Sequence, residues 1–225
     1  MVVFLILPVV IIYFLGLLNV RLITRLLFVF TRSTSAVVWL LALIFLPGTF
    51  IHEMGHFLFA EFMLVKTDDL HLVPEIIDDN SVKLGGIRVE QTDVIRRTII
   101  GLAPILTGIL LMWIASYIVL TYFAYSMWAL FAYIYLLIQV THTMFSSRKD
   151  LEGAVFGFLA ISIIIALLVW ISTIIYIPAF AKVIQDIEDF AVRHVAYLRY
   201  GLWYGVVVDV LISLSTWTVL KLLRR

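Results

Sequence analysis

Residues 35–64 read SAVVWLLALIFLPGTFIHEMGHFLFAEFML, and this one apolar run holds the side chains with the most chemistry in the chain. A helix needs about 20 residues to cross the hydrocarbon core of a bilayer, so the run is longer than one perpendicular span. Pro47 and Gly48 lie inside it, and proline removes a backbone donor and clashes with the preceding turn. The stretch therefore predicts a bent or broken helix within a membrane.

The rest of the chain is equally apolar. Hydrophobic residues make up 64% of its 225 residues, well above the share of about 45 to 50% in soluble domains. Together with residues 35–64, five further runs predict an all-α polytopic membrane protein with about six transmembrane helices. These runs lie at residues 2–19, 98–121, 127–145, 153–179 and 201–219.

Two segments between the runs have other patterns. Residues 70–90 carry apolar stretches on either side of the turn-rich Asp78-Asp79-Asn80-Ser81, which predicts a β-hairpin between the second and third helices. Such a hairpin would either offer a strand edge to an extended peptide or only cover its neighbours. Residues 180–200 have apolar side chains at helical spacing with charges between them, which predicts an amphipathic helix lying on the membrane.

Charge and cysteine content limit the possible partners. The net charge is +1, with neither a basic stripe nor an acidic tail, so no nucleic-acid partner is expected. The chain has no cysteine, so His, Asp or Glu must hold any metal. The lipid bilayer is the expected surrounding, and nothing in the sequence indicates an oligomeric state.

Basic residues predict the orientation, because Lys and Arg are retained preferentially in the cytoplasm. Six alternating spans divide the 16 Lys and Arg residues ten to six, with the larger group on the side of the hairpin and of both termini. The sequence thus predicts a multi-pass protein with its hairpin and both termini in the cytoplasm.

The chemical motif is His52-Glu53-Met54-Gly55-His56, an H-E-x-x-H pattern. Residues four apart share one helix face, so both imidazoles can bind one metal while Glu53 reaches a water that the metal holds. Two His and a Glu are costly to place in a lipid-embedded helix, and ionisable residues there usually have a function. The pattern predicts a zinc hydrolase with His52 and His56 as ligands and Glu53 as the base.

A catalytic zinc usually has three protein ligands, so one is still missing. Asp150 closes the fourth run on the same predicted membrane side as the end of the second run near His56, and it is the first candidate. Asp209, a lone carboxylate in the last run, is the alternative. His142 is expected to pack between helices or to support the site from behind, and His71 and His194 look like ordinary surface residues.

The sequence resembles the site-2 protease family of intramembrane zinc metalloproteases over about residues 52 to 153. The matching elements are the H-E-x-x-H helix, a β-containing loop with Leu84-Gly85-Gly86, Gly101-Leu102-Ala103-Pro104, and Asp150. The resemblance implies one Zn²⁺ per chain on His52, His56 and Asp150, and Glu53 as the residue that activates water. It also implies membrane-protein substrates and a compact prokaryotic type located in the cell membrane.

On this resemblance the whole chain, 1–225, is one protease domain, with a catalytic core at about 35–153 and peripheral helices at 1–20 and 153–225. The expected reaction is hydrolysis of peptide bonds in or beside transmembrane segments of substrate proteins. Two alternatives remain. One is a catalytically degenerate zinc-binding scaffold or transporter. The other is a membrane zinc protease acting on prenylated C-termini, for which Glu152 would be the third ligand.

Overall fold

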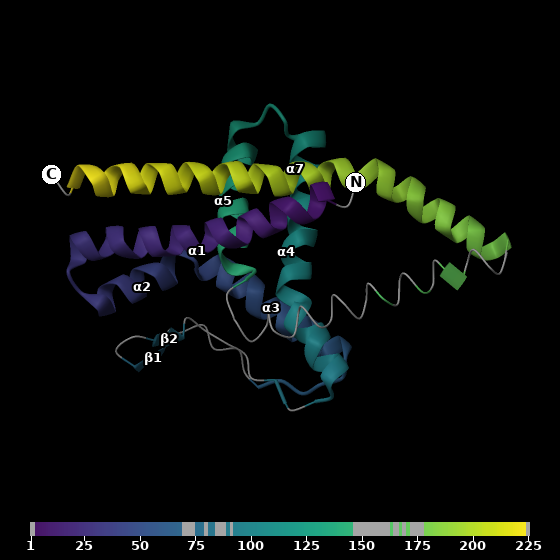
Figure 1. Cartoon of the computed structure of the whole chain (residues 1–225), viewed down its shortest axis with the longest axis horizontal. Helices are drawn as coiled ribbons and strands as arrows, with labels where there is room; N and C mark the ends of the chain where they lie inside the picture. Colours follow the sequence, from purple (N-terminus) through teal and green to yellow (C-terminus); the bar gives the residue numbers. More distant parts are fainter. Residues whose placement is uncertain are drawn as a thin grey trace.

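The computed structural model describes residues 3–68, 75–78, 81–83, 89–90, 92–145, 163, 167, 170–171 and 178–223. Helices dominate this part of the chain, as the sequence predicted (Figure 1). In chain order the elements are α1 (Val3–Thr31), α2 (Thr34–Ile44), α3 (Leu46–Phe62), β1 (Glu75–Asp78), β2 (Ser81–Lys83), α4 (Val94–Tyr122), α5 (Met127–Thr143) and α7 (Pro178–Leu223).

The number of membrane-spanning helices is smaller than predicted for the part of the chain described. Three helices are long and apolar enough to cross a membrane, namely Leu5–Thr31, Val94–Tyr122 and His194–Leu223. The bent pair α2 and α3 brings the number to at most four, and α5 is shorter, with 17 residues. Most of the predicted span at 153–179 lies outside the described residues. Several long apolar helices fit an integral membrane protein, but a count of six is not reached.

The distribution of side chains also fits a lipid surrounding, because polar groups are inside and large apolar groups are outside. The buried polar residues are Asn19, Thr49, His52, Glu53, His56, Ser116, Gln139, Thr141, Thr143, Asp209, Ser213 and Thr216. Exposed positions include Phe14, Phe30, Leu43, Phe62 and Trp128. In lipid, polar side chains face the protein interior and apolar ones face the acyl chains. The described helices follow this rule.

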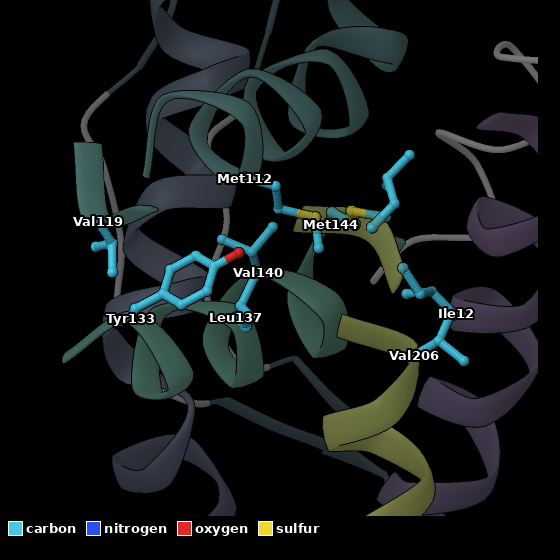
Figure 2. Packing of buried hydrophobic residues seen from close by; sticks show 9 residues of the cluster. Ile12, Met112, Val119, Tyr133, Leu137, Val140, Met144 and Val206 are labelled. Atoms are coloured by element: carbon cyan, nitrogen blue, oxygen red, sulfur yellow. The ribbon is translucent and has the colours of Figure 1, made fainter. Parts of the chain in front are cut away.

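The apolar core lies where α1, α4, α5 and α7 meet (Figure 2). It consists of Ile12, Met112, Val119, Tyr133, Leu137, Val140, Met144, Leu202 and Val206. Gly201 of α7 is at the contact with α4, where a Cβ would lie 2.8 Å from the Met112 carbonyl oxygen and 2.6 Å from Ser116 Oγ. Glycine there lets the two helix backbones approach closely, as small residues do in membrane helix pairs.

Helices α1 and α7 lie side by side and run in the same direction. Ile12 is near Gly205, and seven residues further along α1 the Asn19 amide donates to the Asp209 carbonyl oxygen at 3.0 Å. The start of α1 and the end of α7 are therefore at opposite ends of the pair (Figure 1). If both helices cross one bilayer, this arrangement disagrees with the prediction of both termini on one side.

The structure differs from the sequence prediction in two further respects in this region. The predicted surface helix at 180–200 and the predicted span at 201–219 belong to one continuous helix, α7, which runs from Pro178 to Leu223. The hairpin of α4 and α5 passes across α1 and α7 rather than alongside them (Figure 1). The described helices thus do not form a bundle of six spans that all run up and down together.

The break predicted at Pro47-Gly48 is confirmed. Helix α2 ends at Ile44, α3 begins at Leu46, and the two axes differ by 67°. Gln139 of α5 reaches into the break: the Gly48 N–H donates to Gln139 Oε1 at 3.0 Å, and Gln139 Nε2 donates to the Ile44 carbonyl oxygen at 3.0 Å. A straight helix would join Ile44 and Gly48 directly, because they are four residues apart. The side-chain amide therefore replaces one lost helical hydrogen bond with two.

The segment between α3 and α4 has its two ends tied together. Thr67 and Val89 form an antiparallel bridge, and the Glu90 N–H donates to the Lys66 carbonyl oxygen at 3.0 Å. Within this segment β1 and β2 pair antiparallel, in four and three residues, where the sequence predicted a hairpin. The residues around and between these strands lie outside the described part. Asp93 then caps α4 by accepting from the backbone N–H groups of Ile95 and Arg96.

The Gln139 contact gives a stability prediction. Gln139→Met keeps the size of the side chain but leaves the Gly48 N–H and the Ile44 carbonyl without these partners in a buried site. Each of the two unsatisfied groups costs about 1 to 3 kcal/mol, so the free energy of unfolding should fall by about 2 to 6 kcal/mol. Reversible unfolding in detergent measures it. The control is Tyr135→Phe, an exposed position on the same helix, which should change stability by less than about 0.5 kcal/mol. Equal effects of the two changes would contradict the role of Gln139.

Candidate metal site

His52, Glu53 and His56 lie together on the inner face of α3. Their exposed fractions are 4%, 8% and 8%, whereas Leu58 and Phe62 on the same helix are 54% and 80% exposed. The imidazole rings of His52 and His56 contact each other edge to face, with centroids 4.9 Å apart. The predicted i, i+4 arrangement is therefore present, and both rings point into the protein.

A hydrogen bond to α4 holds the ring of His56. Its Nδ1 lies 2.8 Å from the Ile100 carbonyl oxygen. A carbonyl oxygen only accepts, so Nδ1 must carry the proton, and the lone pair of a neutral ring is then on Nε2. Metal-binding histidines usually donate their second ring nitrogen to a carbonyl or a carboxylate in this way. The ring of His56 fits a metal ligand in this respect.

The carbonyl of Ile100 accepts from His56 for a reason that is visible in the sequence. In a regular helix this oxygen would accept from the N–H of residue 104, but residue 104 is Pro104, which lies inside α4 and has no N–H. Proline thus releases a carbonyl at the position that faces His56. Gly55 lets α3 approach this part of α4, because a Cβ there would lie only 3.3 Å from Pro104 Cα.

The described residues do not show a third ligand for the predicted metal ion. Asp150, the predicted ligand, and Glu152 and His71 all lie outside them. In residues 3–68, 92–145 and the other described segments, no group of three or more His, Cys, Asp or Glu is arranged to hold a metal ion. The described part of the candidate site therefore consists of the two imidazoles of His52 and His56, with Glu53 buried on the same helix.

The other residues considered for the site, Asp209, His142 and His194, contact side chains of other helices. Asp209 accepts from the Thr141 hydroxyl at 3.0 Å and lies 3.6 Å from His142 Nδ1. The other side of His142 stacks on Phe45, the residue between α2 and α3, with ring centroids 5.2 Å apart. His194, expected at the surface, is partly buried against the rings of Trp113 and Tyr117.

Sequence reasoning did not find two polar contacts of the interior. Gln139 supports the start of α3, and Asn19 joins α1 to α7. Their signal was a single amide inside or at the edge of an otherwise apolar run. Such residues are costly in lipid unless they have partners, so each was a candidate for a buried contact.

No protein-family model matches the chain. Comparisons with curated proteins and with solved structures also give no significant match.

Proposed function

We propose that this chain is a zinc-dependent intramembrane endopeptidase, which hydrolyses peptide bonds in or beside transmembrane segments of substrate proteins. The observation that carries the proposal is the buried His52-Glu53-His56 face of α3, with the His56 ring fixed by the Ile100 carbonyl. Ionisable side chains on the inner face of a lipid-exposed helix are functional by default. The resemblance to the site-2 protease family supports the same reading.

In this proposal each residue has one role. His52, His56 and Asp150 would hold the metal, which would supply Lewis acidity for the activation of water near neutral pH. Glu53 would accept a proton from the attacking water and pass it to the amine that leaves. The hydrogen bond from His56 Nδ1 keeps the ring in one tautomer and orientation. Glu53 is buried on the same helix as the two imidazoles.

The strand pair β1 and β2 has a role in the same proposal. A substrate helix shields its peptide bonds by its own hydrogen bonds, so it must unwind locally before it is cut. An unwound segment needs new backbone partners. The strand pair β1 and β2 precedes α4 in the chain, and among the described residues each strand pairs only with the other, which leaves one outer edge on each for β-augmentation. We assign the extended substrate to one of these edges.

One observation favours a rival function. A zinc-binding scaffold or transporter would also bury ionisable groups, and His142 with Asp209 forms a second buried pair. Cleavage separates the two functions: a purified scaffold would bind zinc but leave a model transmembrane substrate intact, whereas the protease would release two fragments of it.

The first prediction for the site concerns Glu53. Glu53→Gln should keep about one zinc per chain and lose turnover by about 10²- to 10⁴-fold, because the group that accepts the proton of water is gone. Metal analysis and cleavage of a transmembrane substrate measure the two effects. Glu61→Gln, an exposed position on the same helix, is the matched control and should change neither. Full activity in Glu53→Gln would exclude Glu53 as the base.

The second prediction concerns the third ligand. Asp150→Ala should lower both zinc occupancy and cleavage, because a direct ligand is removed. Asp209→Asn should leave zinc occupancy near the wild-type value, since Asp209 is engaged with Thr141 and His142. Glu152→Gln should have the mildest effect. Zinc loss in Asp209→Asn but not in Asp150→Ala would reverse the assignment.

The third prediction concerns orientation. Arg21, Arg25 and Lys221 lie toward the same end of the parallel α1 and α7, and basic residues favour the cytoplasm. In this cysteine-free chain, Lys221→Cys should react with an impermeant thiol reagent from the cytoplasmic side and Leu5→Cys from the other side. We assign residue 79 to the cytoplasm and the bent pair α2 and α3 to a re-entrant path, so a cysteine at Asp79 should behave like Lys221→Cys. Labelling of Leu5→Cys and Lys221→Cys from one side would contradict the parallel pair of spans.

A further inference from the structure

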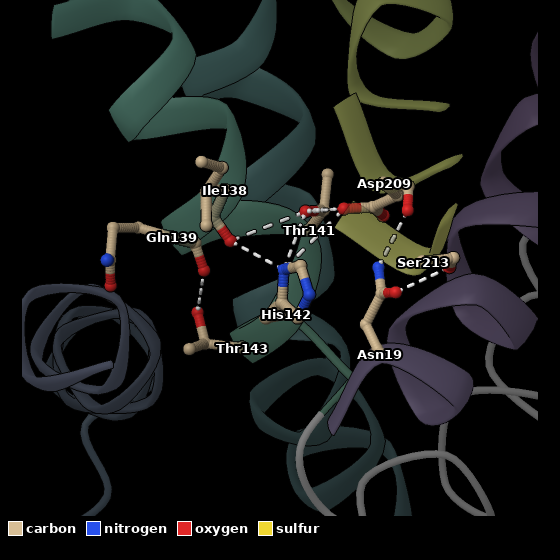
Figure 3. A network of polar contacts seen from close by, with 8 residues as sticks. All are labelled: Asn19, Ile138, Gln139, Thr141, His142, Thr143, Asp209 and Ser213. Atoms are coloured by element: carbon tan, nitrogen blue, oxygen red, sulfur yellow. Dashed lines mark hydrogen bonds and ion pairs between the residues drawn. The ribbon is translucent and has the colours of Figure 1, made fainter. Parts of the chain in front are cut away.

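A second group of buried polar side chains lies where α1, α5 and α7 meet, and the proposed zinc chemistry does not use it (Figure 3). At its centre are His142 of α5 and Asp209 of α7, with His142 Nδ1 3.6 Å from Asp209 Oδ1. Both side chains are 0% exposed. The Thr141 hydroxyl donates to the same carboxyl oxygen at 3.0 Å.

The network continues into α1. The Asn19 amide donates to the Asp209 backbone carbonyl at 3.0 Å, and the Ser213 hydroxyl donates to Asn19 Oδ1 at 2.5 Å. Asn19 and Ser213 carry no charge, and Asn19 contacts the backbone of Asp209 rather than its carboxyl group. Phe45, on the other face of His142, is also uncharged. Within the described helices, the imidazole is therefore the basic group that the fold brings against Asp209.

Two atoms of the pair have no hydrogen-bond partner in the described structure: His142 Nε2 and Asp209 Oδ2. An ionised carboxylate has two oxygens that both need donors, and here only Oδ1 has one. A buried negative charge without a compensating cation is strongly unfavourable in lipid surroundings. The local chemistry requires a positive charge or a proton at this pair.

The donors favour a proton over a metal ion. His142 Nδ1 already lies 2.9 Å from the Ile138 carbonyl oxygen, to which it donates. Only one imidazole nitrogen and one carboxyl oxygen of the pair then remain available to bind a cation. A bound zinc ion usually has three protein ligands, so two atoms are too few. A single proton needs only one of these atoms and makes the pair neutral overall, either as carboxylic acid beside imidazole or as carboxylate beside imidazolium.

We infer that His142 and Asp209 form a buried proton-binding site that holds one proton at neutral pH. The site is independent of the proposed protease activity. It joins α5 to α7, and through the stacking of His142 on Phe45 it also contacts the α2–α3 junction. The two groups titrate as one unit, so the proton belongs to the pair rather than to either residue.

Spectroscopy of the purified full chain in detergent tests the inference directly. At neutral pH, infrared difference spectra should contain the C=O band of a protonated carboxylic acid that is absent in Asp209→Asn, or ¹⁵N spectra should show His142 with both nitrogens protonated. His142→Gln should change the same signals. An ionised Asp209 together with a neutral His142 at neutral pH would overturn the inference. So would a signal that responds to added sodium at constant pH, because the ligand would then be a metal cation.

Stability gives an independent measurement with a defined sign. Unfolded Asp and His bind almost no proton above about pH 7.5, so the folded chain holds one proton more than the unfolded chain there. Stability should therefore fall as the pH rises toward about pH 9, and this loss should disappear in Asp209→Asn.

Asp93→Asn is the matched control. Hydrogen bonds from the backbone N–H groups of Arg96 and Ile95 lower the pKa of Asp93, so this exposed carboxyl stays ionised over the whole range. Its variant should keep the wild-type pH dependence. An unchanged pH dependence in Asp209→Asn would contradict the proton site.

Discussion

The amide of Gln139 bridges the break between α2 and α3, and the position of the candidate site depends on this contact. A helix that breaks in water can give its released carbonyl and N–H groups to solvent. A helix that breaks among apolar residues cannot, and each unpaired group then costs about 1 to 3 kcal/mol. By bonding to Ile44 and Gly48 at once, Gln139 supplies partners to two of the backbone groups released at the bend of 67°. The bend sets the direction in which α3 carries His52, Glu53 and His56.

A second broken helical hydrogen bond is used in the opposite way. Pro104 removes the donor that would have satisfied the Ile100 carbonyl, and His56 of the neighbouring helix takes its place. In one case a side chain repairs a break, and in the other a break supplies an acceptor to a side chain. Both arrangements follow from the rule that backbone groups in lipid must be satisfied within the protein. Irregular helix geometry is therefore found beside the polar residues that depend on it.

Local signals in the sequence predicted the local features well. Pro47 indicated the break because proline acts within its own turn, and the spacing of His52 and His56 placed them on one face because helix geometry is regular.

The tertiary features were harder to predict from the sequence. The first apolar run covers residues 2–19, whereas α1 continues past Arg21 and Arg25 to Thr31. The prediction of two separate helices at 180–200 and 201–219 was also wrong, because both segments belong to α7. Both have helical spacing, and only their polarity differs. The pairing of His142 with Asp209 joins residues of two distant runs, and no single-sequence pattern reports such a contact.

The contact between Asn19 and Asp209 spans 190 residues of sequence. Chains are synthesised from the N-terminus at about 5 to 20 residues per second, so α1 waits roughly ten seconds or more before its partner helix exists. During that time the amide of Asn19 has no Asp209 or Ser213 to bind. Assembly of the interior is thus completed only when α7 arrives. Loss of the last helix would leave α1 with a polar amide that lacks these partners, which is costly in lipid.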